Sequence, residues 1–283
     1  MRQAVIGRVD AGQVVLPLLP QVAAQVVMLA GNPSVDAAQL SGLIHRDPAL
    51  AGQVLRIANS PAYMPKMPIV SLQQAVARLG LNSVTEIAFV ASVQSGTFKV
   101  KGFEAELGRL WRHAIASGVF AKEIARIRRS NVEAAFLCGL LHAVGKPALL
   151  QVVADEELKL AKAQLAAERT ATGATRAALP VILDELHTGV GLRIAELWCL
   201  PRPVVNAIGT YATYDRQPTH TEEAMVTCLA DRLATDLTEP ARFDEATLRD
   251  HAVFAHLNLY PDDVAALRSK RAQVAEAVAA MTV

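Results

Sequence analysis

The residues with the clearest chemical potential are three histidines and a late aspartate, His113, His142, His187 and Asp231. Imidazole and carboxylate groups bind divalent metals, but on helices the ligands must come from separate elements that converge on one point. No two of these residues stand in a short metal-ligand motif. Spacing alone therefore favours the commoner role of such a histidine, a hydrogen-bonded structural residue.

The segment GLLHAVGK, residues 139–146, places His142 at the predicted end of a buried helix. The structural interpretation of His142 is that it caps the C-terminus of this helix, where a histidine interacts favourably with the negative end of the helix dipole. Lys146 follows a glycine stop, where it can be a solvated charge or meet a phosphate. The neighbour Ala143 offers neither a lone pair nor a charge, so it cannot be a ligand.

Composition limits the classes of protein that the chain can belong to. Its 283 residues, 52% of them hydrophobic, predict a compact protein of one or two domains. The 28 Lys and Arg residues nearly balance the 27 Asp and Glu residues, and aromatic content is 5%. Because the charges nearly cancel, the chain as a whole has no net electrostatic attraction to nucleic acid or to an anionic membrane. The three scattered cysteines predict reduced core residues and no disulfide scaffold.

The first third predicts short helices. Asp47-Pro48 is an N-cap followed by a proline at the first helical position, and Ser71 with Gln74 fits a capping box, as does Ser83 with Glu86. The apolar run 14–31 is broken by two prolines, so it predicts a core helix and no membrane span. The only candidate strands lie in residues 4–15, where a turn-like Asp-Ala-Gly predicts a minor N-terminal hairpin.

Longer helices are predicted after residue 97. They cover about 103–128, 131–142, 149–171, 178–198, 203–211 and 221–237, and two further helices are expected from 244 onward, the last opening at 261. We divide the chain into an N-terminal helical part (1–97), a second helical part (98–240) and a C-terminal extension (241–283). Because no flexible linker separates them, one packed body is expected.

The sequence resembles the HDOD domain family, a bacterial signalling group related to the HD and HD-GYP phosphohydrolases. The resemblance covers about residues 16–237. Its most specific pieces are Leu-Pro-Leu-Leu-Pro at 16–20, Arg-Asp-Pro-Ala-Leu at 46–50, Ile-Ala-Asn-Ser at 57–60 and Leu-Gly-Leu at 79–81. The segments LWRHAIASGVFAKEIA, AAFLCGLLHAVGK and ELHTGVGLRIAELWCLPRPVVNAI resemble the HD-like part.

The resemblance implies a degenerate metal site. By position, His113 matches the first histidine of catalytic relatives, His142 the histidine of their His-Asp pair, and Asp231 the late aspartate. Ala143 stands where that pair has its aspartate. Tyr211-Ala212 replaces a frequent His-His pair, and no Gly-Tyr-Pro segment follows His187.

The expectation is therefore an all-α, HD-like multi-helix bundle that acts as a non-enzymatic signalling regulator or scaffold in the cytoplasm. No cofactor is expected, and the partners are signalling proteins, without nucleic acid or membrane. A small nucleotide in the remnant pocket is a further option; that pocket comprises His113, His142, Ala143, Lys146, His187, Tyr211 and Asp231. The alternative is a minimal metal-dependent phosphohydrolase that retains His113, His142 and Asp231 as ligands.

Overall fold

The computed structural model describes residues 1–20, 23–24, 42, 44–63, 67–98, 100–164 and 172–282. Within these ranges the protein is helical and contains no strand, which confirms the all-α expectation. The helices are α1 (Arg2–Asp10), α4 (Pro48–Ala58), α5 (Leu72–Leu79), α6 (Leu81–Gly96), α7 (Glu104–Arg128), α8 (Val132–Leu141), α9 (Gly145–Gln164), α10 (Thr172–Leu197), α11 (Arg202–Thr210), α12 (Glu222–Thr238), α13 (Glu245–Arg249), α14 (Val253–His256), α15 (Pro261–Ser269) and α16 (Arg271–Met281), with the 3₁₀ turns η1 (Tyr211–Arg216) and η2 (Pro240–Arg242).

The predicted N-terminal hairpin was wrong, because Arg2–Asp10 form α1 and the described residues after it, 11–20, contain no strand. Gly12 adopts a left-handed φ of 69°, and its N–H returns to the carbonyl of Val9. A glycine of this kind ends helices as readily as it makes hairpin turns, so the turn signal was ambiguous. Ion pairs from Arg2 to Glu185 and from Arg8 to Glu156 fix α1 against α10 and α9.

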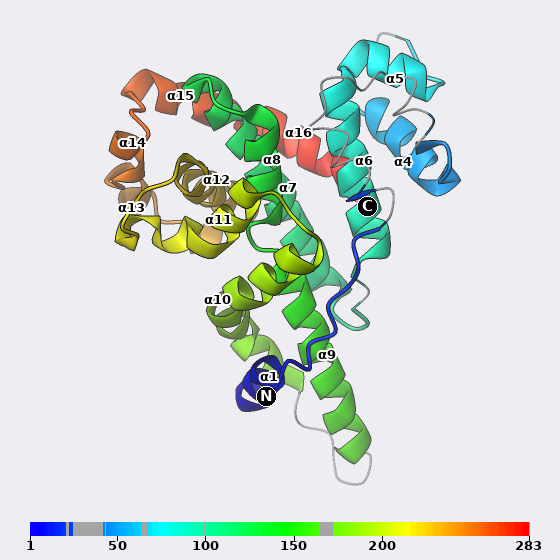
Figure 1. Ribbon diagram of the computed structural model, residues 1–283, viewed down its shortest axis with the longest axis vertical. Coiled ribbons are helices and arrows are strands. Elements are labelled where there is room, and N and C mark those ends of the chain that lie inside the picture. Colours follow the sequence, from blue (N-terminus) through cyan, green and yellow to red (C-terminus); the bar gives the residue numbers. More distant parts are fainter. Residues whose placement is uncertain are drawn as a thin grey trace.

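Residues 13–20 form an extended segment that runs from α1 toward the N-terminal helices (Figure 1). Half of the core helix predicted at 14–31 lies outside the described residues, and residues 14–20 are not helical. Pro17 and Pro20 explain the extended conformation, since proline lacks the N–H that a helix interior requires. The carbonyl of Pro17 accepts a hydrogen bond from the indole N–H of Trp198 at 2.8 Å.

Helices α4, α5 and α6 form one end of the molecule (Figure 1). The caps of α4 and α5 are as predicted: Asp47 accepts from the N–H of Leu50, and Ser71 accepts from the N–H of Gln74. The capping box predicted at Ser83 was wrong. Helix α6 already begins at Leu81, after Gly80, because the backbone of Gly80 has the positive φ of 82° that lets one helix end directly before the next.

The centre of the fold is α7, which packs against α8 and α12, while α9 packs against α10. The contact of α7 with α8 is close: a β-carbon added at Gly139 would overlap the carbonyl of Ser117. Buried residues from Val5 to Met281 belong to one hydrophobic cluster. The close packing fixes the relative positions of the residues on α7, α8 and α12.

The C-terminal part contains more helices than the two that were predicted. Four described helices, α13 to α16, follow η2, and the helix expected from 261 onward is divided at Lys270. The last of them, α16, packs against α7 and α6, so the described C-terminal end lies beside the N-terminal helices (Figure 1). Cys138 and Cys228 are buried as predicted, but Cys199 is exposed at the end of α10.

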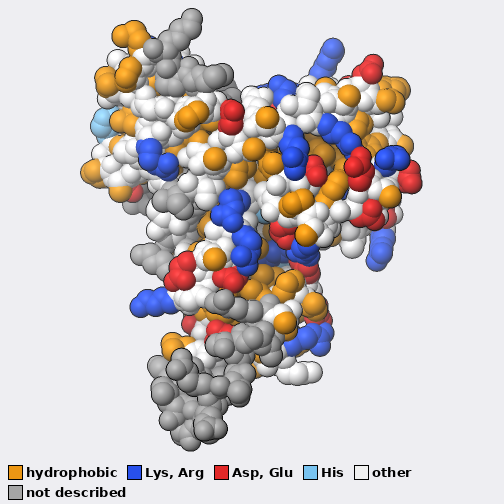
Figure 2. All heavy atoms as spheres, turned by 180° about the vertical axis from the view of Figure 1, so that it is seen from behind, with side chains coloured by type: hydrophobic (Ala, Val, Ile, Leu, Met, Phe, Trp, Pro, Cys, Tyr) orange, Lys and Arg blue, Asp and Glu red, His pale blue; other side chains and the backbone are white. Residues whose placement is uncertain are grey.

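Among the described residues, Val132–Lys159 is the one segment that is long and apolar enough to span a bilayer by length and composition. Its apolar window is 78% buried inside the protein, as is typical of core helices. On the face shown in Figure 2, Lys and Arg side chains are interspersed with Asp and Glu. This mixture agrees with the near-zero net charge of the sequence.

Candidate functional site

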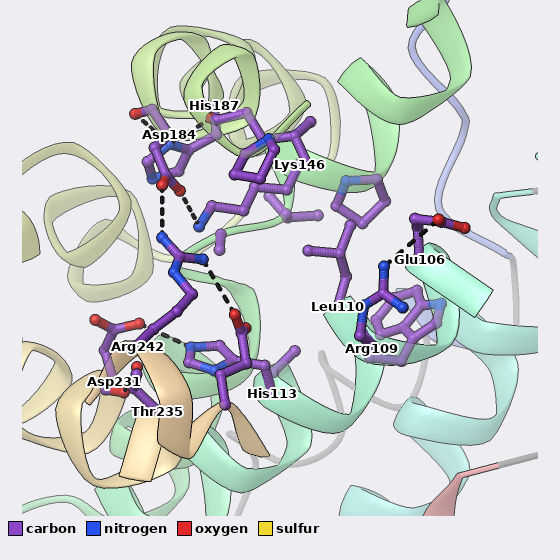
Figure 3. Close-up of a pocket in the computed structure, with 18 of the residues that line it drawn as sticks. Glu106, Arg109, Leu110, His113, Lys146, Asp184, His187, Asp231, Thr235 and Arg242 are labelled. Carbon is purple, nitrogen blue, oxygen red and sulfur yellow. Dashed lines mark hydrogen bonds and ion pairs between the residues drawn. The ribbon is translucent and has the colours of Figure 1, made fainter. Parts of the chain in front are cut away.

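A cavity of about 400 Å³ opens between α7, α9, α10, α12 and η2 (Figure 3). Six of the seven residues predicted for the remnant pocket line it: His113, Ala143, Lys146, His187, Tyr211 and Asp231. The seventh, His142, is 1% exposed and contacts both Asp231 and Tyr211. The tertiary structure therefore brings together residues that lie up to 118 positions apart in the sequence.

Two histidines share one carboxylate oxygen at the floor of this cavity. The Nε2 of His113 lies 2.8 Å from Oδ1 of Asp231, and the Nε2 of His142 lies 3.1 Å from the same oxygen. The side chains of His113, His142 and Asp231 are 11%, 0% and 28% exposed. Their three ligand atoms lie within 4.8 Å of one another, a spacing that one metal ion can bridge.

The other nitrogen of each ring is already a donor. Nδ1 of His142 lies 2.6 Å from the carbonyl of Gly139, which can only accept. Nδ1 of His113 lies 3.2 Å from the hydroxyl of Thr238, whose proton is donated to the carbonyl of Ala234. Both Nε2 atoms of the neutral rings are therefore lone-pair acceptors, and both face a carboxylate oxygen.

Three converging acceptors need a positive charge between them, either an imidazolium proton or a cation. Burial alone would raise the pKa of Asp231, but the hydrogen bonds and charges of His113 and His142 outweigh it and hold that pKa well below its usual range. Two imidazole nitrogens and one carboxylate oxygen also fit a divalent transition metal with open positions. When bound, such an ion would supply Lewis-acid chemistry.

The ligand set is smaller than the resemblance would give in a catalytic relative. Ala143 lies beside His142 and lines the cavity, and its methyl group coordinates nothing. Among the described residues, the group of metal-ligating side chains found here contains only His113, His142 and Asp231. The residues therefore fit an ion held by three protein ligands, without a second carboxylate.

His187 and Tyr211 close one side of the cluster. Nδ1 of His187 donates to the carbonyls of Leu183 and Asp184, each at 3.0 Å, so Nε2 accepts from the hydroxyl of Tyr211 at 3.0 Å. Burial, together with the charges of Lys146 and His142, lowers the pKa of His187 to about 4. Burial also raises the pKa of Tyr211 well above its usual value. Both side chains are therefore neutral near pH 7.

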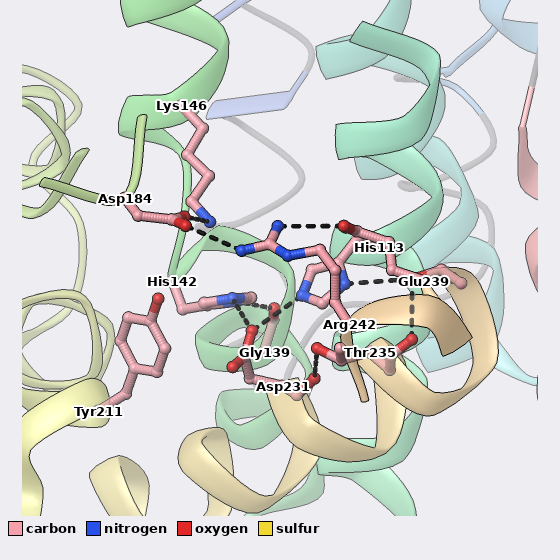
Figure 4. A network of polar contacts seen from close by, with 12 residues as sticks. His113, Gly139, His142, Lys146, Asp184, Tyr211, Asp231, Thr235, Glu239 and Arg242 are labelled. Carbon is pink, nitrogen blue, oxygen red and sulfur yellow. Dashed lines mark hydrogen bonds and ion pairs between the residues drawn. The ribbon is translucent and has the colours of Figure 1, made fainter. Parts of the chain in front are cut away.

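Across the cavity mouth, two cations share one carboxylate (Figure 4). Nζ of Lys146 lies 2.7 Å from Oδ1 of Asp184, and Nη2 of Arg242 lies 2.9 Å from Oδ2. Arg242 also contacts Glu239 at 3.1 Å. Burial would raise the pKa of Asp184, but these two cations lower it overall. The lysine that sequence alone left as a solvated charge or a phosphate ligand is thus ion-paired.

Sequence reasoning missed Asp184, Glu239 and Arg242. Asp184 precedes His187 by three positions on α10, so the two residues share a helix face, a spacing that could have indicated it. Nothing in the sequence relates Arg242 to Asp184, which lies 58 positions earlier. Trp111 is 7% exposed and also lines this cavity.

Comparison with known proteins places this geometry in a family context. The sequence matches the HDOD domain family over residues 16–214. A protein from Treponema pallidum (strain Nichols) described as uncharacterized is 28% identical over 200 residues, or 68% of this chain. The matched region spans about 37% of that relative's length.

Several solved structures share the fold. An HDOD domain protein of unknown function from Geobacter sulfurreducens has a TM-score of 0.70 at 21% identity, covering 98% of this chain and 97% of its own. A "putative phosphohydrolase" from Shewanella amazonensis SB2B has a TM-score of 0.70 at 21% identity, covering 98% of each chain. A "putative signal transduction protein" from Marinobacter aquaeolei VT8 has a TM-score of 0.69 at 24% identity, covering 95% and 60%.

These structural likenesses support the fold, and the match over residues 16–214 supports the family. The helical architecture agrees with both. The chain belongs to the HDOD domain family.

Proposed function

We propose that this protein is a non-enzymatic signalling regulator or scaffold that acts by binding other proteins. The observation that carries the proposal is the methyl group of Ala143 beside His142 in the cavity. Hydrolysis of a phosphoester at such a site needs a well-held ion and a group that handles protons. Asp184, a second aspartate that lines the cavity, is ion-paired with Lys146 and Arg242.

Two exposed apolar side chains, Met67 and Val70, support binding to a protein. The side chain of Asn59 donates to the carbonyl of Ile69 and accepts from its N–H, both at 2.8 Å, and Arg78 donates to the carbonyl of Met67. The backbone is thereby held, yet Met67 and Val70 are 65% and 72% exposed. Methionine side chains adapt to apolar partner surfaces at low cost, so this segment suits a protein contact.

An activity assay tests the non-enzymatic part of the proposal. The purified protein, supplied with manganese, iron or zinc, is expected to hydrolyse neither cyclic dinucleotides nor simple phosphomonoesters and diesters. Reproducible turnover that disappears in a His142→Ala variant would contradict it. The variant is needed because a contaminating hydrolase would give turnover in both preparations.

A paired substitution tests the binding surface. Met67→Ser with Val70→Ser is expected to leave thermal unfolding nearly unchanged, since both side chains are exposed. The same variant is expected to lose the partner that the wild-type protein captures from its native cell. A matched control is Val181→Ser on α10, where the side chain is 61% exposed. Equal capture by the wild type and the Met67/Val70 variant would exclude this surface.

A second candidate function is metal-dependent phosphoester hydrolysis at a three-ligand site. The orientation of the two histidine rings favours it, because both Nε2 lone pairs converge on the Asp231 oxygen. Metal analysis after expression with iron, manganese and zinc separates the candidates. A stoichiometric ion in the wild type that is lost in His142→Ala supports this second function, and a lack of metal in both supports the first.

A further inference from the structure

A second cavity, also of about 400 Å³, lies where the N-terminal helices, the start of α7 and the end of α16 meet. Gln53 comes from α4, Gln94 from α6 and Trp111 from α7, with Phe98 in the connection between α6 and α7. Thr282, after α16, forms part of the wall. This cavity is separate from the His-Asp-His cluster.

Four side-chain atoms on residues of this cavity wall have no hydrogen-bond partner among the described residues. Nε2 of Gln53, both amide atoms of Gln94 and Nε1 of Trp111 are buried and make no hydrogen bond. They are four of the eleven such atoms in the described part of the chain, yet they sit on three residues around one cavity. Native proteins pair nearly all their buried donors and acceptors, so this concentration indicates groups that await a ligand.

The chemistry of these groups defines the ligand. A glutamine amide both donates and accepts, which matches the adjacent N7 acceptor and N6 donor of adenine. An indole N–H can only donate, which suits another ring nitrogen. The rings of Phe98 and Trp111 lie 6.1 Å apart at 52°, forming an aromatic corner against which a planar base can pack. Lys101 is exposed at the mouth.

We propose that this cavity binds the adenine base of a nucleoside or nucleotide, held by Gln53, Gln94 and Trp111. Trp111 is 7% exposed and lines both this cavity and the one above the His-Asp-His cluster. A ligand bound in the second cavity is therefore expected to affect the first cavity through its contact with the shared Trp111 ring. The site lies at the junction of the N-terminal helices with α7, where a bound base would brace the two against each other.

Fluorescence of the full chain tests the proposal. The sequence contains two tryptophans, so a Trp198→Phe background leaves Trp111 as the single reporter. Adenosine and AMP are titrated to millimolar concentration, with cytidine as a base of different hydrogen-bonding pattern. Saturable change with adenosine or AMP, and at least about tenfold weaker change with cytidine, is the expected result.

Substitutions test the contacts. Gln94→Leu removes two unpartnered buried atoms, so it is expected to weaken adenosine binding about tenfold or more without lowering the melting temperature. Gln53→Leu provides a second test if that variant folds poorly. Gln73→Leu, on the exposed surface of α5, is the matched control and should bind as the wild type does.

Three results would overturn the inference: no saturable response to adenosine or AMP, equal affinity for cytidine, or unchanged adenosine binding in both Gln94→Leu and Gln53→Leu. A calorimetric titration of the wild type excludes a silent binding event. These outcomes are independent of the hydrolysis assay, because no residue of the His-Asp-His cluster is changed.

Discussion

Acidification should destabilise the fold through His187. This side chain is 5% exposed, and its Nδ1 and Nε2 are held by carbonyl oxygens and by the Tyr211 hydroxyl. The neutral ring satisfies both contacts, with Nδ1 donating to the carbonyls and Nε2 accepting from the hydroxyl, whereas protonation would place a charge in a buried position near Lys146. In the unfolded chain the ring protonates near pH 6.5, whereas burial lowers its pKa in the folded protein to about 4.

The sign and size of the effect follow from this difference. Between pH 6.5 and 4 the unfolded state binds a proton that the folded state does not, so stability is complete above pH 6.5 and declines as pH falls. At about 1.4 kcal/mol for each pKa unit, the full loss is about 3 kcal/mol. Below pH 4 the folded ring also protonates, and this contribution stops changing.

Urea unfolding at pH 7.5, 6, 5 and 4 measures the effect in wild type and in His187→Gln. Glutamine retains hydrogen-bonding capacity but does not titrate, so the difference between the two proteins isolates this histidine from the other ionisable groups. The wild type should lose about 3 kcal/mol more than the variant across the range. A difference between the two proteins that stays constant with pH would refute the reasoning, and so would a wild type that gains stability on acidification.

Two further changes give clear expectations. Gly145→Ala should lower the melting temperature strongly, because the added β-carbon would overlap the carbonyl of His187. Gly189→Ala is the matched control. Because the space around Gly189 is open, this substitution should stabilise α10 by about 0.5–1 kcal/mol. Equal thermal shifts would contradict the close packing of α9 on α10. Ala143→Asp should raise the affinity for manganese or zinc at least about tenfold, because it adds a carboxylate beside His142. An unchanged affinity in calorimetry would show that a side chain at position 143 cannot reach the ion.

Much of the helical framework was predictable from the sequence, because the signals are local. Asp47 before Pro48 and Ser71 before Leu72 mark helix starts through hydrogen bonds made within the same turn. Local signals failed where one residue type serves two structures. Gly12 ends a helix in place of a hairpin turn, and Lys270 divides a helix that the apolar pattern joined.

The residue types suggested candidates for the site, and the family resemblance assigned three of them to one ligand set. His113, His142 and Asp231 were named in this way, and their contacts agree with that assignment. The ion pairs of Asp184 with Lys146 and Arg242 had no comparable signal. An ion pair between residues on different helices cannot be predicted from the sequence pattern, because the number of positions between the two residues follows no helical or strand period.

The sequence by itself determined the helical class, the principal helix starts and the alanine at position 143, because propensity, capping and residue identity are local properties of the chain. Only the tertiary structure decided which nitrogen of each histidine faces the aspartate, which cations pair with Asp184 and which glutamines lack partners. These features depend on the packing of α4, α6, α7, α8 and α12, and such packing is fixed by contacts between residues far apart in the chain.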